Sequence, residues 1–158
     1  SGYGTLLAEK TPFNTGDVLI AHSVSGRNPV AIDLALEAKK KGVSIIAITN
    51  IAYSQSAPSR HSSGKRLFEI ADIVIDNHGD IGDATCEVDG VSQKVAPSST
   101  VVGATIVNTI VVEVVKKLVE AGINPPPIFY SANLDGGDEQ NKRLFEKFKE
   151  TIHYRFNA

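Results

Sequence analysis

Three short apolar runs constrain the fold of this chain more than any other feature. They span residues 18–24, 44–49 and 72–76, and each is mostly apolar along its whole length. Runs of this kind are typical of buried parallel strands, which are hydrophobic on both faces. Between the first two runs, apolar residues recur at helical spacing from Asn28 to Gly42, which predicts one strand–helix–strand unit. We therefore expect an α/β fold with a mainly parallel sheet.

Local signals define the ends of this helix. Asn28 is a favoured N-cap, Pro29 suits the first helical position, and Gly42 is placed as the C-cap. After the second run comes a long polar loop over residues 50–63, and then a short predicted helix over residues 65–71 that leads into the third strand. The first half of the chain is therefore predicted to alternate strands and helices.

The second half contains a predicted hairpin and two helices. Residues 85–95 alternate around Asp89-Gly90, a dipeptide that suits a type I′ turn and predicts a small β-hairpin insertion. Residues 99–122 predict a long helix, although their many β-branched side chains leave a strand open for part of this segment. The last element is a charged amphipathic helix over residues 138–153.

The helix at residues 99–122 is apolar almost all the way round. Such a helix is expected to be buried between the sheet and a further element, most economically a second subunit. We therefore expect a homodimer or a larger homo-oligomer.

Length and charge exclude several classes of protein. The 158 residues are enough for one domain, 1–158, with a hydrophobic core, and a formal charge of −2 without a basic cluster argues against nucleic-acid binding. The single cysteine, Cys86, makes no internal disulfide or zinc pattern, is expected to be a buried small apolar residue, and favours a reducing, cytoplasmic compartment. The longest apolar run, residues 101–115, is too short to cross a bilayer, so no membrane partner is expected.

The segment after the first strand contains the clearest chemical signal. Ser23 and Ser25 lie two residues apart, where the strand turns into the capped helix, and Gly26 can adopt a positive φ. Backbone amides and a helix N-terminus attract anions, so these hydroxyls, with Arg27 and Asn28, suit a phosphate monoester. The alternative is that the serines only cap the backbone.

The order of these motifs resembles the SIS (sugar isomerase) domain over residues 16–122. The motifs are the S-x-S-G loop, the strand ending in Ile-Thr at 48–49, the A-D-I-V-I run at 71–75 and the A-P-S-S-T segment at 96–100. Residues 52–54, 59–65 and 131–138 resemble a smaller bacterial group known only as sugar isomerase domain-containing proteins.

This resemblance implies a three-layer α/β/α sandwich, of flavodoxin-like or Rossmann-like type, that binds a phosphorylated sugar. Ser23 and Ser25 would bind the phosphate, and Ser99 or Thr100 would lie nearby. No cofactor and no metal are implied. Asn28 replaces the third hydroxyl residue that many of these loops contain, which changes the geometry of that position. The upstream strand of the family is also missing, so we expect the chain to be the later part of a longer protein, incomplete at its N-terminus.

Candidates for catalysis are few. An aldose–ketose isomerase needs a base that moves a proton between adjacent carbons, and Glu87 is the first candidate, with a solvated hairpin residue as the alternative. His61 is a candidate for ring opening or for binding an anionic substituent, with a solvated basic loop as the alternative.

Three functions fit these residues. The leading hypothesis is a sugar-phosphate isomerase, or a lyase acting on an amino-sugar phosphate. The second is a non-catalytic sensor of sugar phosphates. A binder of nucleotide or flavin phosphate is the third, although both glycine-rich nucleotide motifs are missing.

Overall fold

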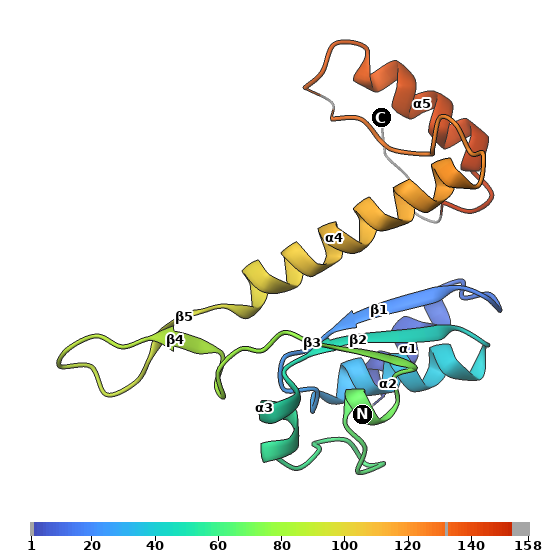
Figure 1. Ribbon diagram of the computed structural model, residues 1–158. Coiled ribbons are helices and arrows are strands. Elements are labelled where there is room, and N and C mark those ends of the chain that lie inside the picture. The colour runs from blue at the N-terminus through green and yellow to red at the C-terminus, as the bar shows by residue number, and fades with distance from the viewer. Residues whose placement is uncertain (1, 132, 153–158) are drawn as a thin grey trace. The chain divides into compact units, whose positions relative to one another are not determined.

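The computed structural model describes residues 2–131 and 133–152, and the chain forms two compact units, Ser1–Val107 and Asn108–Ala158. The first unit is built on a sheet of three parallel strands in the order β1-β2-β3 (Figure 1). These strands are β1 (Val18–His22), β2 (Ser44–Thr49) and β3 (Ile73–Asp76). The predicted α/β class with a parallel sheet is confirmed.

Helix α2 (Pro29–Lys40) connects β1 to β2 and begins as predicted. The side chain of Asn28 accepts a hydrogen bond from the main-chain amide two residues later, at 3.0 Å. The C-cap is Lys41, one position before the predicted Gly42, which follows it with a φ of 78°.

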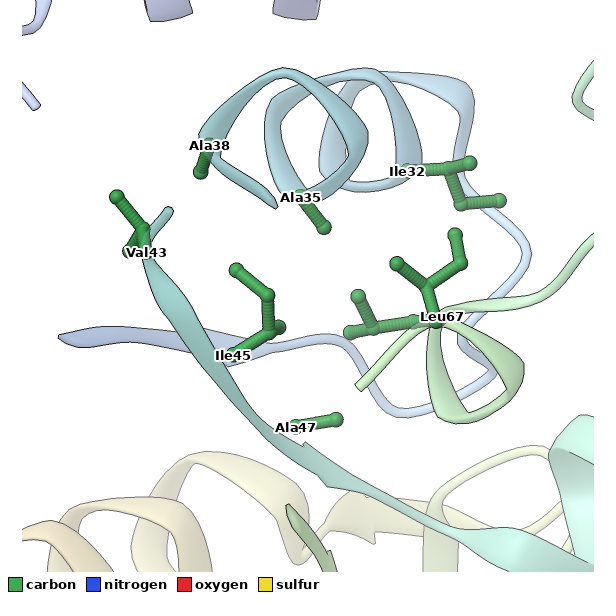
Figure 2. Packing of buried hydrophobic residues seen from close by; sticks show 8 residues of the cluster. Ile32, Ala35, Ala38, Val43, Ile45, Ala47 and Leu67 are labelled. Atoms are coloured by element: carbon green, nitrogen blue, oxygen red, sulfur yellow. The ribbon is translucent and has the colours of Figure 1, made fainter. Parts of the chain in front are cut away.

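The hydrophobic core lies between α2 and one face of the sheet. Ile32 and Ala35 of α2 are fully buried with Ile45 of β2 and Leu67 (Figure 2). Leu67 begins η1 (Leu67–Glu69), a single 3₁₀ turn where a helix was predicted over residues 65–71. Burial of each large aliphatic side chain contributes about 1.5 to 3 kcal/mol, so this core fixes the start of α2 against the sheet.

The opposite face of the sheet is only partly covered. Val18, Ile20 and Ile73 share this face through the strand register, and they are 57%, 37% and 55% exposed. The prediction that the strands are buried on both faces is therefore wrong for this chain by itself. The reason is that α2 and η1 pack on one face alone.

Helix α1 (Tyr3–Lys10) was not predicted, and it packs on α2. The contact requires a glycine, because a Cβ on Gly4 would lie 2.3 Å from the carbonyl oxygen of Val30. The N-cap residue of α1, Gly2, has no side chain to mark the helix start. Tertiary packing rather than local signals therefore stabilises α1.

A second helix interrupts the predicted polar loop at residues 50–63. This is α3 (Ile51–Ser56), which begins where the side chain of Asn50 accepts a hydrogen bond from the Tyr53 amide at 2.8 Å. The same asparagine is buried at the end of β2, so the capping residue is held in place by the sheet.

The predicted hairpin is present as β4 (Ala84–Cys86) and β5 (Val95–Pro97), which are antiparallel. Its turn differs from the prediction, because Gly90 has a positive φ of 79° and Asp89 does not. The strands are joined by a long loop, residues 87–94, instead of a two-residue type I′ turn. Cys86 is exposed, so its predicted burial is wrong, because the hairpin has no covering layer over this side chain.

The predicted long helix is α4 (Ser99–Glu120), which begins in the first unit and ends in the second. Much of its apolar surface is exposed, including Val101 at 70% and Val112 at 53%. The predicted burial of this helix is therefore not found within the described chain. No helix in the described part of the chain is long and apolar enough to cross a membrane.

The second unit also contains α5 (Gly137–Phe148), which begins one residue before the charged helix predicted over residues 138–153. The Asn141 side chain pairs with the main chain of Tyr130, through bonds of 2.8 and 2.9 Å. This ties the segment before the helix to its first turns. The predicted last residue, His153, lies outside the described residues.

Candidate functional site

The serine loop, residues 23–28, connects the end of β1 to the start of α2. The amide of Ser23 donates to the carbonyl of Ile48 at 3.0 Å, which continues the pairing with β2, and the amide of Gly26 donates back to the carbonyl of Ser23 at 3.0 Å. Together these bonds fold the loop against the carboxyl end of the sheet, the edge at which open α/β sheets bind ligands.

Gly26 is the residue that allows this turn. It has a φ of 59° and is buried, and a Cβ there would lie 2.7 Å from the Oγ of Ser54 and 3.3 Å from the Oγ1 of Thr49. A side chain is therefore excluded both by the backbone conformation and by the fully buried neighbours.

The two serines differ from the residue that caps the helix. Asn28 provides the cap, whereas the half-buried hydroxyls of Ser23 and Ser25 make no hydrogen bond within the described part of the chain. Both serines directly precede the start of α2 in the chain, and the helix dipole is positive at that end. The alternative in which the serines cap the backbone is not what the structure shows.

The side chain and the main chain of Arg27 differ in their hydrogen bonding. Its Nε is buried and has no hydrogen-bond partner among the described residues, while its carbonyl accepts from the Arg60 amide at 3.3 Å. The serine loop and the segment around residue 60 are therefore joined through the main chain.

Several polar residues that sequence reasoning missed lie at the same edge of the sheet. Asn50 and Asn77 follow β2 and β3 and are 1% and 7% exposed. The Asn50 amide donates to the carbonyl of Gly79, and the Asn77 side chain accepts from the Gly79 amide at 3.1 Å. A Cβ on Gly79 would lie 3.4 Å from the Oγ of Ser98, which brings the segment before α4 to this edge.

The start of α4 is already capped by a carboxylate. Asp83 accepts hydrogen bonds from the main-chain amide and the hydroxyl of Ser99, at 2.9 and 2.5 Å. Ser99 is 7% exposed and is committed to this interaction, whereas Thr100 is exposed. Of the two residues that the family resemblance placed near a phosphate, Thr100 is thus the one whose side chain remains accessible.

The first turns of α4 also contact the end of β1. A Cβ on Gly103 would lie 2.3 Å from the ring of His22, so the absence of a side chain at Gly103 lets the two elements approach. Because Ser23 follows His22 directly, this contact brings α4 and the serine loop to one end of the sheet.

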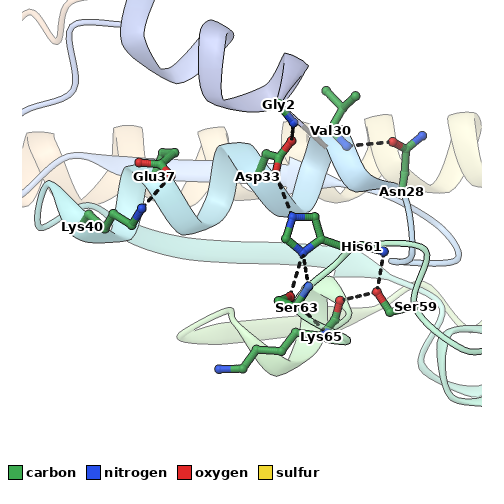
Figure 3. Close-up of polar contacts among 10 residues, drawn as sticks. All are labelled: Gly2, Asn28, Val30, Asp33, Glu37, Lys40, Ser59, His61, Ser63 and Lys65. Atoms are coloured by element: carbon green, nitrogen blue, oxygen red, sulfur yellow. Dashed lines mark hydrogen bonds and ion pairs between the residues drawn. The ribbon is translucent and has the colours of Figure 1, made fainter.

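His61 lies in the segment 59–65, which we call the His61 loop (Figure 3). Its Nε2 is 2.7 Å from Oδ1 of Asp33 on α2, and the side chains of His61 and Asp33 are 7% and 6% exposed. The interpretation of His61 as a solvated loop residue is therefore wrong, because α2 supplies a buried acceptor 28 residues away in sequence.

Asp33 remains a carboxylate in this environment. Burial alone would raise its pKa, but hydrogen bonds from the Gly2 amide, at 2.6 Å, and from His61 outweigh this effect, so the pKa of Asp33 lies below its ordinary value. A buried negative charge is thus held next to the imidazole.

Glu87 lies apart from these groups. It is exposed in the loop 87–94, and none of its described contacts involves the serine loop or the His61 loop. It interacts electrostatically with Lys94, whose pKa is raised by the hydrogen bond with Asp80 and, to a smaller extent, by Glu87. The structure of the chain by itself does not bring Glu87 to the serine loop.

The described residues contain no group of three or more His, Cys, Asp or Glu side chains that could hold a metal ion. The chemistry available at this edge of the sheet is therefore that of hydroxyls, amides, one helix N-terminus and the buried Asp33–His61 pair.

Comparison with known proteins agrees with this arrangement. A family model described as SIS domain matches residues 1–50, which include β1, the serine loop and α2. Over these residues the chain is similar to the SIS domain family.

Individual relatives carry the name UPF0309. The chain is similar to a UPF0309 protein of Shouchella clausii, with 58% identity over 153 residues, covering 97% of this chain and 62% of that protein. One from Oceanobacillus iheyensis is 54% identical over 153 residues, with the same coverage, and one from Geobacillus thermodenitrificans is 49% identical over 144 residues, covering 91% of this chain and 57% of the relative. The chain thus spans less than two thirds of these proteins.

Proposed function

We propose that the protein binds a phosphorylated sugar at the serine loop and acts as a sugar-phosphate isomerase, or as a lyase for an amino-sugar phosphate. One observation supports this most: the hydroxyls of Ser23 and Ser25 have no hydrogen-bond partner in the described chain, at a helix start that Asn28 already caps. Half-buried hydroxyls of this kind are ready to donate to the oxygens of a phosphate.

The helix start adds electrostatic support to the proposal. The N-terminus of α2 presents partial positive charge to the loop, and Gly26 packs the loop backbone against Ser54 and Thr49. Neutral donors and a helix dipole suit a phosphate ester, while the exposed Thr100 would be available to sugar hydroxyls.

The test is a titration of the full protein with hexose phosphates, amino-sugar phosphates and the matching unphosphorylated sugars. Calorimetry reports binding, and NMR of the same mixtures reports any product. We expect binding of phosphorylated sugars only. Equal affinity for the unphosphorylated sugars, or no binding of either set, contradicts the phosphate site.

Turnover is proposed to depend on Glu87 as the base. Glu87→Gln is expected to retain phosphosugar affinity and to lower the rate about 10²- to 10⁴-fold, because general acid–base catalysis contributes roughly that much. Glu139→Gln, a substitution on exposed α5, is the control. Equal rates for Glu87→Gln and the parent exclude Glu87 as the base.

A specific observation favours a second candidate, the non-catalytic sensor. Glu87 has no described contact with the serine loop, so the proposed base does not lie beside the proposed phosphate in the part of the chain that the structure describes. For a sensor, sugar phosphate raises the melting temperature and NMR detects no product, which separates it from the isomerase.

We also propose that the protein is a homodimer in which α4 contributes to the interface. The exposed valines of α4 would otherwise leave a large apolar surface in water. Replacing Ile106 and Ile110 with Lys is expected to dissociate the dimer or to unfold it, as measured by sedimentation. A folded monomer of the unmodified protein contradicts this interface.

A further inference from the structure

The His61 loop and α2 together contain a second group of reactive side chains, separate from the serine loop. Asp33, His61 and Ser63 form a continuous series, with Asp33 Oδ1 2.7 Å from His61 Nε2 and His61 Nδ1 2.7 Å from Ser63 Oγ (Figure 3). A carboxylate, an imidazole and a hydroxyl connected in this order are the groups that activate a serine for nucleophilic attack.

The backbone determines the tautomer of His61. The main-chain amide of Ser63 donates to Nδ1 at 3.0 Å, so Nδ1 is an acceptor without a proton. The ring proton is therefore on Nε2, where it is donated to Asp33. This leaves Nδ1 as the acceptor for the hydroxyl proton of Ser63, which is the arrangement required of a general base.

Burial differs along the series. The side chains of Asp33 and His61 are 6% and 7% exposed, whereas Ser63 is exposed. The second oxygen of Asp33 accepts from the Gly2 amide, so the carboxylate is fixed by α1 as well as by its own helix. The base is thus held rigidly inside the protein, and the hydroxyl that it activates faces solvent.

We propose that Ser63 is the nucleophile of a serine-hydrolase type of site that acts on carboxylic esters, with His61 as its general base and Asp33 as the residue that positions His61. This site is independent of the proposed sugar-phosphate site. Relative to serine proteases, the two ring nitrogens have exchanged roles, since Nδ1 faces the serine and Nε2 faces the carboxylate.

The reaction balances with the groups present. The Oγ of Ser63 forms a bond to the ester carbonyl carbon and its proton moves to Nδ1 of His61, while Asp33 stabilises the imidazolium. The bond to the leaving alcohol then breaks, and the alcohol takes the proton from Nδ1. Water attacks the acyl-serine, gives a proton to Nδ1 and releases the carboxylic acid. That proton returns to Ser63, so no further reactant is needed.

Neighbouring groups indicate which esters are preferred. The main-chain amide of Lys65 donates to Ser63 Oγ at 3.2 Å and helps to fix the position of this hydroxyl. The exposed side chains of Arg60 and Lys65 are on the same loop. Esters with a negatively charged acyl group are therefore favoured over neutral ones.

The test is covalent labelling of the full protein by a fluorophosphonate probe, followed by peptide mass spectrometry. Attack by Ser63 forms an oxygen–phosphorus bond and releases fluoride, so we expect a stable adduct on the peptide that contains Ser63. Ser63→Ala is expected to abolish this adduct, and Ser62→Ala, at the exposed neighbouring position, is the matched control that retains it.

The base and the positioning residue are tested by the labelling rate. His61→Gln and Asp33→Asn are expected to lower it by about 10²-fold or more, because the general base or its orientation is lost. Circular dichroism of each variant shows whether it is folded, and Ser63→Ala tests the site without disturbing a buried residue.

Two results overturn the proposal. One is the absence of an adduct on Ser63 in the parent protein, which would mean that the series only stabilises the loop. The other is unchanged labelling of Ser63 in folded His61→Gln. Neither result bears on the sugar-phosphate titration, which uses Ser23 and Ser25.

Discussion

Two serine-containing segments lie next to α2, and they satisfy their polar groups in opposite ways. In the His61 loop, the hydroxyls of Ser59 and Ser63 both make hydrogen bonds, and so do both ring nitrogens of His61. In the serine loop, the hydroxyls of Ser23 and Ser25 make none within the described chain. The first segment is completed by the protein itself, whereas the second has donors that remain available to a ligand.

The difference shows that residue type alone does not identify a site. Both segments contain serines, a glycine and basic residues, and both are attached to the first half of α2. Only the pattern of hydrogen bonds separates a segment whose polar side chains bind one another from one whose hydroxyls remain available. Replacing the hydrogen-bonded side chains of the first segment should therefore affect stability, and replacing the two serines of the second should affect binding.

The largest effect is expected at the glycine that shapes the serine loop. Gly26→Ala places an alanine at a positive φ and puts its Cβ 2.7 Å from the Oγ of the fully buried Ser54. The free energy of unfolding should therefore fall by about 2 to 5 kcal/mol. Urea unfolding measures this loss.

Gly90→Ala is the matched control for this prediction. Gly90 also has a positive φ, of 79°, but nothing lies within 4 Å of its Cβ position, so only backbone strain of about 1 to 2 kcal/mol is expected. Equal losses for Gly26→Ala and Gly90→Ala would show that the close packing around the serine loop is not needed.

An intermediate effect is expected at the buried pair of the His61 loop. Asp33→Asn replaces one carboxylate oxygen by a donor, so either the Gly2 amide or His61 loses its acceptor. The free energy of unfolding at pH 7 should fall by about 1 to 3 kcal/mol, the cost of an unsatisfied buried donor. Thermal and urea unfolding provide the measurement.

The pH dependence of this loss tests its cause. The pKa of Asp33 is lower in the folded protein than in the unfolded chain, so the carboxylate contributes stability above its unfolded pKa of about 3.9 and loses it as the pH falls through the folded pKa. The difference between parent and Asp33→Asn should therefore shrink below about pH 4. A constant difference across that range would mean that ionisation of Asp33 is not responsible.

The smallest effect is expected in the serine loop, and it should appear in binding alone. Ser25→Ala should weaken sugar-phosphate binding by about 0.5 to 1.5 kcal/mol, and by more if the hydrogen bond is charge-assisted. Stability should change by less than about 0.5 kcal/mol, because no partner is lost. Calorimetry measures the affinity of Ser25→Ala, and Ser92→Ala, at an exposed position of the hairpin, is the control. Unchanged affinity in the Ser23→Ala/Ser25→Ala double variant would show that these hydroxyls do not bind the phosphate.

The sequence predicted those parts of the fold that depend on neighbouring residues. The parallel strands, the cap at Asn28 and the turn at Gly26 all follow from patterns a few residues long. Helix α1 was missed because its stability comes from the close packing of Gly4 on α2, and Gly2 gives no capping signal. The hairpin turn was mispredicted because Asp89-Gly90 lies in a longer loop.

The candidate site was predictable to a similar extent. The serine loop is a local motif, whereas the pairing of His61 with Asp33 and of Ser99 with Asp83 joins residues 28 and 16 positions apart. Nothing in the spacing of those residues indicates which acidic side chain will face which partner. Only the packing of α2 and of the chain around α4 determines these contacts.

The interaction between Asp83 and Ser99 determines where the chain should tolerate an insertion or a deletion. The Asp83 carboxylate caps α4, and the Asp83 carbonyl accepts from the Ser98 amide at 3.2 Å, so both ends of the hairpin are fastened to each other. The hairpin between them is largely exposed. Insertions, deletions or a grafted peptide at residues 88–93 should therefore leave β3 and α4 undisturbed, which makes this part of the loop a suitable position for a tag or a reporter.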